Sequence, residues 1–397
     1  MRPELFAGRR PQLDAGLALL RQAAAGNVRH GLVTGDRGIG KSSLASQIEG
    51  LARADAQTLA LLNLTTKDMP QRFLVAEYTA QNGETLVEVV TGLLDALNRE
   101  RKTPSFGFDV TVELDFKLIR AKLTPTDQPR DVTISFVDAI EKVWNEVKGK
   151  VAGILFVIDE IDRVATAPGM ATFFKVSTEL LPKRGLESII LLPVGMIGVQ
   201  DLLKAEHKSV GRVFEKIEVP TLSDDEAMQI VTRALAGTGA TIQPDVNREI
   251  ARLSGGFPNP VHLLGSEAYD AARKNQGSIG PDELKTALQS VVAGKWKSEF
   301  ETSFIDAGSG KNREILRAMA MHGDTDVPVS IVCTALGVKQ PEISANIGSL
   351  MERDVIVRVD RGVYRIKEPL LRQYIRHMNV LGAKVPVQHR PRKRSKE

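Results

Sequence analysis

The chain has 397 residues, of which 42% are hydrophobic and 26% charged, and its formal net charge is +4. This composition is ordinary for a soluble globular protein of two or three domains. The single cysteine, Cys333, excludes an internal disulfide bond and a zinc site built from cysteines. The longest apolar stretch, residues 189–199, is too short to span a bilayer, so we expect a cytoplasmic protein with no membrane role.

The positive charge is concentrated at the end of the chain. Residues 384–397 contain six basic residues and one acidic residue, so they carry +5 and residues 1–383 carry −1. The body of the protein is therefore not basic, and attraction to polyanions is expected mainly from a tail, residues 381–397. Such a tail either keeps a protein soluble or binds nucleic acid.

A phosphate-binding loop lies near the start of the chain, between an apolar run at residues 30–34 and a helical pattern that begins at Lys41. Its glycines let successive backbone N–H groups point at phosphate oxygens. Lys41 would then reach the β- and γ-phosphates of a nucleotide, and Ser42 would coordinate Mg²⁺. The alternative is a glycine-rich turn without a ligand, but the strand and helix on either side favour nucleotide binding. The pattern G-x-x-x-x-G-K-[ST] is formed by Gly35, Asp36, Arg37, Gly38, Ile39, Gly40, Lys41 and Ser42, and Ser43 follows it.

The next segment contains a second strand at residues 73–78 and an amphipathic helix at 84–97. Residues 106–118 then alternate between apolar and polar side chains, which predicts part of a β-hairpin. We interpret residues 100–132 as an insertion into the core, followed by a helix at 134–147. The insertion could contact a partner or substrate, or it could cap the sheet.

A second decisive stretch, residues 153–162, is a continuous apolar run that ends in acidic residues. Such a run is typical of a central parallel strand covered on both faces, and its carboxyl end is where α/β sheets place ligands. Asp159 would hold Mg²⁺ through water, and Glu160 would polarise the water that attacks the γ-phosphate. A buried strand that ends in a helix-capping acid is the alternative, which the phosphate-binding loop on the same chain makes less attractive.

Strand and helix patterns alternate up to residue 219, which predicts an α/β fold with a doubly wound parallel sheet. From Ser223 to Val292 only helical patterns occur, and Ser223 with Glu226 resembles a capping box. We therefore assign residues 1–221 to a P-loop ATPase core and residues 222–298 to a helical lid.

Residues 310–380 have the pattern of a winged helix, with three helices followed by a hairpin around residues 360–362. If this domain binds DNA, its third helix would enter the major groove. The third helix is polar but not basic, so docking to a protein is an open alternative. The expected contacts to backbone phosphates are Arg358, Arg361, Arg365 and Lys367.

On these motifs the chain resembles the AAA+ ATPases, in particular the origin-recognition/initiator and archaeal-type branch with a C-terminal winged helix. The resemblance covers residues 5–378 and also includes the segments 6–9, 211–214 and 254–258. It implies that Arg9 and Pro258 lie at the nucleotide. It also implies that Arg212 reaches the γ-phosphate of a neighbouring subunit; the alternative is that Arg212 is an ordinary surface arginine.

Two positions depart from the family pattern. Gly198 occupies the place of a polar residue, often Asn, that orients the attacking water, and Asn259 occupies the place of an arginine in the lid. Both changes remove groups that stabilise the transition state, so we expect intact ATP binding with slow hydrolysis.

The leading hypothesis is an AAA+ ATPase that binds ATP and Mg²⁺, forms homo-oligomers through Arg212, and acts on DNA in replication, transposition or plasmid regulation. The alternative is a STAND-type signalling or antiviral-defence ATPase whose winged helix contacts proteins. An inactive nucleotide-binding scaffold is less attractive, because Lys41, Ser42, Asp159 and Glu160 are all present.

Overall fold

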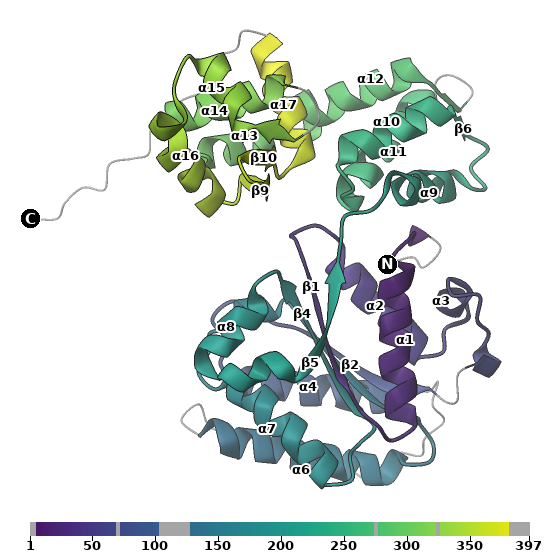
Figure 1. The fold of residues 1–397 in the computed structure, drawn as a ribbon. Coiled ribbons are helices and arrows are strands. Elements are labelled where there is room, and N and C mark those ends of the chain that lie inside the picture. The colour runs from purple at the N-terminus through teal and green to yellow at the C-terminus, as the bar shows by residue number, and fades with distance from the viewer. Residues whose placement is uncertain (1–4, 69–71, 103–127, 274–276, 323–325, 381–397) are drawn as a thin grey trace, which may run out of the picture. The chain divides into compact units, whose positions relative to one another are not determined.

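The computed structural model describes residues 5–68, 72–102, 128–273, 277–322 and 326–380. The chain folds into two compact units, Met1–Thr221 and Leu222–Glu397 (Figure 1). Within the described ranges, no helix combines the length and the apolar character needed to cross a membrane.

The first unit is built on a five-stranded sheet in which every pair of neighbouring strands is parallel. Because the connections between parallel strands cross over through helices, all the carboxyl ends meet at one edge of the sheet. The strand order is β2 (Phe73–Thr79), β3 (Gly153–Asp159), β4 (Ile189–Met196), β1 (His30–Gly35) and β5 (Phe214–Val219).

Helices cover both faces of this sheet, which confirms the predicted doubly wound α/β fold. On one face α1 (Arg10–Ala24) packs against β1, β4 and β5, and α2 (Lys41–Ala52) packs beside it. The short α3 (Ala56–Ala60) follows α2. The other α-helices among the described residues of the unit are α4 (Leu86–Arg101), α6 (Pro129–Val147), α7 (Met170–Lys183) and α8 (Val199–Glu206).

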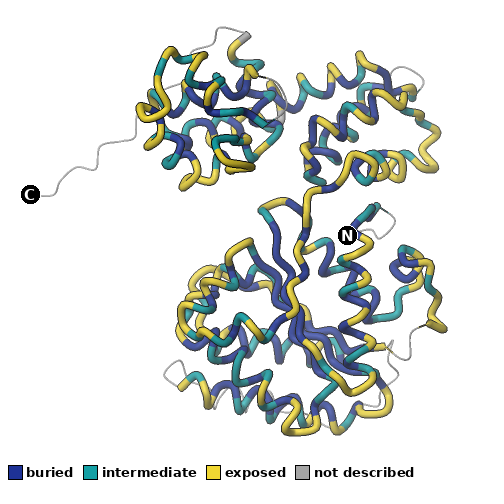
Figure 2. Tube along the Cα trace, in the orientation of Figure 1, coloured by how far each residue is buried: buried dark blue, intermediate teal, exposed yellow. Residues whose placement is uncertain are grey.

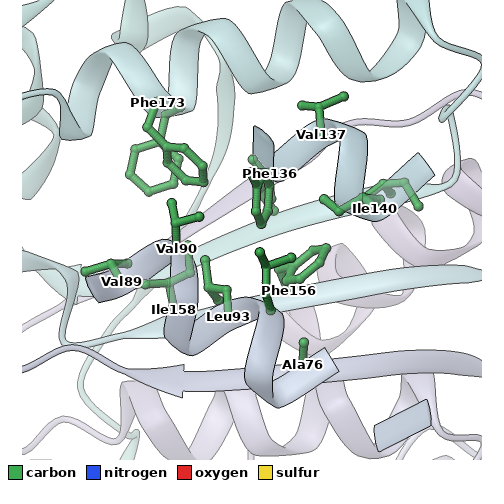
Figure 3. Packing of buried hydrophobic residues seen from close by; sticks show 14 of the residues in the cluster. Ala76, Val89, Val90, Leu93, Phe136, Val137, Ile140, Phe156, Ile158 and Phe173 are labelled. Atoms are coloured by element: carbon green, nitrogen blue, oxygen red, sulfur yellow. The ribbon is translucent and has the colours of Figure 1, made fainter. Parts of the chain in front are cut away.

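The main core lies between the second face of the sheet and helices α4, α6 and α7 (Figure 3). The ring of Phe136 on α6 lies 5.3 Å from that of Phe156 on β3 and 5.0 Å from that of Phe173 on α7. The three central strands β3, β4 and β1 are buried along almost their whole length (Figure 2), and all six residues of β1 are buried. This packing fixes the strand ends that carry the candidate site.

Described helices extend into both ends of the predicted insertion, residues 100–132, which itself stays a prediction. Helix α4 continues to Arg101, and α6 already begins at Pro129, since proline is well suited to the first turn of a helix. The predicted hairpin at residues 106–118 lies outside the described residues.

The second unit begins with helices, as predicted, and Ser223 forms the expected capping box with Glu226 at the start of the first helix. The prediction of helices alone was wrong, because β6 (Thr241–Ile242) and β7 (Ser278–Ile279) form a short parallel pair. Strands of two residues are too short to leave a period-two pattern in the sequence. The helices are α9 (Asp224–Leu235), α10 (Pro244–Ser254), α11 (Pro258–Ala272) and α12 (Pro281–Ser290).

The C-terminal part of this unit combines helices with a small antiparallel sheet. Its strand order is β8 (Val327–Pro328), β10 (Val363–Ile366) and β9 (Ile356–Asp360). The hairpin β9–β10 turns at Gly362, whose φ of 72° suits a residue without a side chain. The helices are α13 (Lys297–Asp306), α14 (Lys311–Met321), α15 (Val329–Leu336), α16 (Gln340–Glu352) and α17 (Pro369–Val380).

Candidate functional site

The phosphate-binding loop connects β1 to α2 at the carboxyl edge of the sheet. Gly38 and Gly40 have φ values of 74° and 94°, a region that side chains disfavour, and Gly40 caps the N-terminus of α2. A Cβ atom on Gly35 would lie 2.8 Å from Ile39 Cγ2 and 3.1 Å from the carbonyl oxygen of Val219. The glycines of the motif are thus required by the backbone shape and by close packing.

The ammonium group of Lys41 lies over this loop. Lys41 Nζ donates a hydrogen bond of 2.9 Å to the carbonyl oxygen of Asp36 and lies 3.5 Å from Met196 Sδ at the end of β4. Burial lowers the pKa of Lys41, and the carboxylates of Asp162, Glu160 and Asp159 oppose that shift. A cation at this position can be directed at the phosphates of a nucleotide.

The acidic residues at the end of β3 lie on the same edge. Asp159 Oδ1 accepts a hydrogen bond of 2.8 Å from the backbone N–H of Glu160. Glu160 has a φ of 55°, and its carboxylate pairs with Arg163 at 3.4 Å. Arg163 also donates to Gln81 Oε1 at 3.3 Å. The structure therefore brings Lys41, Asp159 and Glu160 together, as the sequence predicted.

Three neighbours of this site were not assigned roles from the sequence. Asp162 Oδ1 accepts a hydrogen bond of 2.9 Å from the backbone N–H of Met196 and so connects the turn after β3 to the end of β4. Arg163 holds the carboxylate of Glu160. Asp162 and Arg163 follow directly in the chain, so their closeness to the acidic motif was a usable signal, whereas Met196 gave none.

Gly198 lies just beyond the end of β4 (Ile189–Met196). We predicted that Gly198 replaces the polar residue that follows the strand, but Gly198 caps α8 with a φ of 91° and is exposed. The side chain that reaches Lys41 from the end of β4 is that of Met196. The assignment of Gly198 to the place of the water-orienting residue stays a prediction.

Arg9 contacts the backbone of the phosphate-binding loop. It has a φ of 59°, and its side chain is 4% exposed. Its guanidinium group donates hydrogen bonds to the carbonyl oxygens of Ile39 and Gly40, the latter at 3.2 Å. The observed contacts of Arg9 are thus with the loop backbone, and its predicted contact with a nucleotide stays a prediction.

Arg212 lies at the amino ends of the strands, whereas the phosphate-binding loop lies at their carboxyl ends. It is exposed and ends a 3₁₀ helix, Lys208–Arg212, two residues before β5. Because β5 is parallel to β1, with Phe214 opposite His30 and Val219 opposite Gly35, Arg212 and the loop lie at different ends of the strands. The strand length separates them by roughly 20 Å. Arg212 therefore does not approach the loop of its own chain.

Pro258 and Asn259 belong to the second unit, where Pro258 is the first residue of α11. Asn259 lines a cavity between α9 and α11. Their predicted relation to a nucleotide stays a prediction.

The four basic side chains expected to contact DNA lie on or beside the β9–β10 hairpin. Arg365 forms a bidentate ion pair with Asp326: its Nε donates to Asp326 Oδ1, and its Nη2 donates to Asp326 Oδ2 at 2.9 Å. Lys367 binds both carboxylate oxygens of Asp354 at 2.7 and 2.8 Å. Arg358 donates to the carbonyl oxygen of Asp360 at 3.3 Å, and Arg361 is exposed. Two of the four cations are thus bound to carboxylates from other segments.

The donor set fits Mg²⁺ bound together with a nucleotide. Ser42 at the start of α2 and Asp159 at the end of β3 offer oxygen atoms, which Mg²⁺ prefers. In the part of the chain that the structure describes, no group of three or more His, Cys, Asp or Glu residues could hold a metal ion by itself. Mg²⁺ ions that act on nucleotides take one or two carboxylates and complete their shell with phosphates and water.

Two segments of the chain match known family models. Residues 5–180 match a family model described as AAA ATPase domain, and residues 298–375 match a domain of unknown function (DUF8462). No curated protein matches the sequence.

The whole chain is also similar in fold to solved structures. The ORC2 protein of Aeropyrum pernix, solved as ADPNP-ADP complexes, has 14% identity and a TM-score of 0.57, with 94% of each chain covered. A Walker-type ATPase of Pyrococcus abyssi has 18% identity and a TM-score of 0.53, with 91% of this chain and 95% of that chain covered. Residues 5–180, which include the phosphate-binding loop and part of the parallel sheet, are thus similar to an AAA ATPase domain.

Proposed function

We propose that the protein binds ATP with Mg²⁺ and hydrolyses it slowly, as a nucleotide-dependent switch. The observation that carries this proposal is the convergence of Lys41, Asp159 and Glu160 at the carboxyl edge of the sheet. The backbone of the loop and Lys41 would bind the phosphates, while Ser42 and Asp159 would hold Mg²⁺. Mg²⁺ would neutralise charge that develops on the phosphates. Glu160 would polarise the attacking water.

Slow turnover is supported by two contacts at this edge. The carboxylate of Glu160 is paired with Arg163 at 3.4 Å, so accepting a proton from water requires that this pair weakens. The end of β4 offers the thioether of Met196 rather than an amide. A thioether is a weak hydrogen-bond acceptor and cannot donate to water.

Assembly into a homo-oligomer is supported by the position of Arg212. Because Arg212 is exposed at the edge opposite its own loop, a catalytic role requires the loop of a second copy. A guanidinium group suits that role, since it is always charged and binds phosphate oxygens in a fork. ATP would thereby favour the assembled state, and hydrolysis would release it.

DNA is the target we propose first, contacted by the C-terminal module as a winged helix and by the basic tail. A second candidate is a STAND-type signalling or defence switch whose C-terminal module contacts proteins. The ion pairs Arg365–Asp326 and Lys367–Asp354 favour this second candidate, because they reduce the charge that the hairpin can offer to phosphates.

The proposal is tested by ATP binding and by mass in solution. ATP should bind the wild type and bind the variant Lys41→Ala roughly tenfold to a hundredfold more weakly, as expected for a lost charge-assisted hydrogen bond. Lys204→Ala is the control, because Lys204 is paired with Asp201 on α8. Equal ATP affinity in Lys41→Ala and wild type would contradict the proposal.

Two further measurements test assembly and target. A non-hydrolysable ATP analogue should increase the mass of the wild type in solution but leave Arg212→Ala unchanged. A salt-dependent gel shift with duplex DNA, with and without residues 384–397, separates the targets. DNA binding that survives removal of the tail supports a role of the C-terminal module in DNA binding, and no binding by either form favours a protein target.

A further inference from the structure

The turn after β3 carries a further carboxylate, Asp162, to which the proposed function gives no task. Asp162 Oδ1 accepts a hydrogen bond of 2.9 Å from the backbone N–H of Met196, the last residue of β4. A Cβ atom on Gly195 would lie 3.1 Å from the same oxygen, so the glycine before Met196 lets the carboxylate approach the end of the strand closely. Asp162 is thus held at the carboxyl edge of the sheet by a backbone group of the neighbouring strand.

Met196 in turn contacts the phosphate-binding loop. Its Sδ lies 3.5 Å from Nζ of Lys41, and the same Nζ donates a hydrogen bond of 2.9 Å to the carbonyl oxygen of Asp36. Strand β4 is paired with β3 on one side and with β1, which leads into the loop, on the other. A continuous series of contacts therefore runs from Asp162 through Met196 to Lys41.

The charge of Asp162 also acts on Lys41 directly. Burial lowers the pKa of Lys41, and among the carboxylates that oppose this shift Asp162 has the largest effect, ahead of Glu160, Asp159 and Asp36. The carboxylate of Glu160 is paired with Arg163 at 3.4 Å. Asp162 is thus the carboxylate that most favours the charged ammonium group at this edge.

We propose that Asp162 is a positioning residue that limits the affinity of the loop site for nucleotide. This inference rests on the proposed binding of ATP and names the residue that regulates it. Phosphate oxygens would compete with Asp162 for Lys41 and would bring negative charge toward the carboxylate, and both effects oppose binding. Weaker binding appears mainly as faster dissociation, so Asp162 would hasten nucleotide release, which a switch requires.

The variant Asp162→Asn separates the charge from the hydrogen bond. An amide oxygen can still accept from the backbone N–H of Met196, whereas the negative charge near Lys41 is removed. Titration calorimetry on the full chain should show ATP with Mg²⁺ and ADP binding this variant about tenfold more tightly than the wild type, as expected for the loss of one like charge beside phosphates. Stopped-flow measurements should show slower release of ADP.

The matched control is Asp201→Asn on α8. This variant removes the same charge, but Asp201 is exposed, pairs with Lys204, and is not among the carboxylates that shift the pKa of Lys41. Its nucleotide affinity should stay within about twofold of the wild type. Asp162→Ser is a second neutral variant that keeps a hydroxyl acceptor for Met196, and it should also bind ATP more tightly. The midpoint of thermal unfolding without nucleotide checks that each variant is folded.

The failure of this inference is distinguishable from the failure of the proposed function. Absence of ATP binding by the wild type would contradict the proposed function itself. If the wild type binds ATP, the inference is overturned when folded Asp162→Asn and Asp162→Ser bind ATP as the wild type does or more weakly, because a merely structural role predicts no gain. An equal gain in Asp201→Asn would also overturn it, since the position of the charge would then have no effect.

Discussion

The phosphate-binding loop and the β9–β10 hairpin both carry basic side chains that the sequence assigned to phosphates, yet the structure treats them differently. At the loop, Lys41 and Arg9 lie on backbone carbonyl oxygens of the loop itself. At the hairpin, Arg365 and Lys367 are bound to carboxylates from segments well before them in the chain. A site whose geometry comes from local backbone is predictable from spacing, whereas a site defined by charge depends on which partners the fold supplies.

The largest expected effect is on the rate of ATP hydrolysis and comes from Glu160, which follows β3 beside the phosphate-binding loop. Glu160→Gln should keep ATP binding and lower the hydrolysis rate by about 10²–10⁴-fold, the range for loss of a general base. Arg163→Ala should instead raise the rate, because Glu160 loses the cation that occupies its carboxylate. Steady-state phosphate release checks both variants, and unchanged hydrolysis in Glu160→Gln would contradict the role given to this residue.

The strand that carries the loop should make stability depend on pH. His30, the first residue of β1, accepts a hydrogen bond of 3.1 Å from the backbone N–H of Leu191, and burial lowers the pKa of His30 to about 4. The neutral form is therefore required in the folded state. Its contribution is complete above pH 6.5 and is lost as the pH falls toward 4, amounting to about 3 kcal/mol in the free energy of unfolding.

The variant His30→Asn isolates this contribution, since an amide oxygen can replace the ring nitrogen as acceptor. Chemical denaturation at pH 7 and at pH 4 should show a smaller loss for the variant than for the wild type. The comparison with the variant is needed because burial raises the pKa of Glu49 to about 7, which changes stability in the opposite direction. Equal losses in both proteins would show that His30 does not titrate as inferred.

A neighbouring pair of arginines tests how far backbone support determines the loop. Arg9→Ala should weaken ATP binding about tenfold, because the carbonyl groups of Ile39 and Gly40 lose a charged donor, and Arg9→Lys should restore part of the affinity. Arg10→Ala should have little effect, since Arg10 is exposed and paired with Asp14. Equilibrium titration with a fluorescent ATP analogue measures all three variants. Equal effects of Arg9→Ala and Arg10→Ala would show that the hydrogen bonds from Arg9 to the loop do not support ATP binding.

The smallest expected effect is at the hairpin. Asp354→Asn should release Lys367 from its ion pair and raise affinity for duplex DNA about twofold at low salt, because one more cation becomes available to the backbone. Asn is tolerated at the φ of 58° found at this position. A gel shift at two salt concentrations measures the change. A loss of DNA affinity in this variant would show that Lys367 is not a latent phosphate contact.

Part of the candidate site was predictable from the sequence because its residues stand next to each other or at the ends of strongly apolar strands. The spacing from Gly35 to Ser42 predicted the loop, and the run before Asp159 predicted a buried strand that delivers carboxylates to the same edge. The contacts of Arg9 and Met196 were not predictable, since each depends on a backbone conformation or a strand end that leaves no periodic pattern.

The sequence by itself determined the α/β class, the phosphate-binding loop and the acidic strand end, because short-range spacing and long apolar runs dictate backbone geometry directly. Only the tertiary structure decided that Arg212 lies at the edge opposite its own loop, that Met196 rather than Gly198 faces Lys41, and that Arg365 is bound to Asp326. These outcomes depend on strand order and on charges brought together from distant segments, and neither is encoded in any local stretch of the chain.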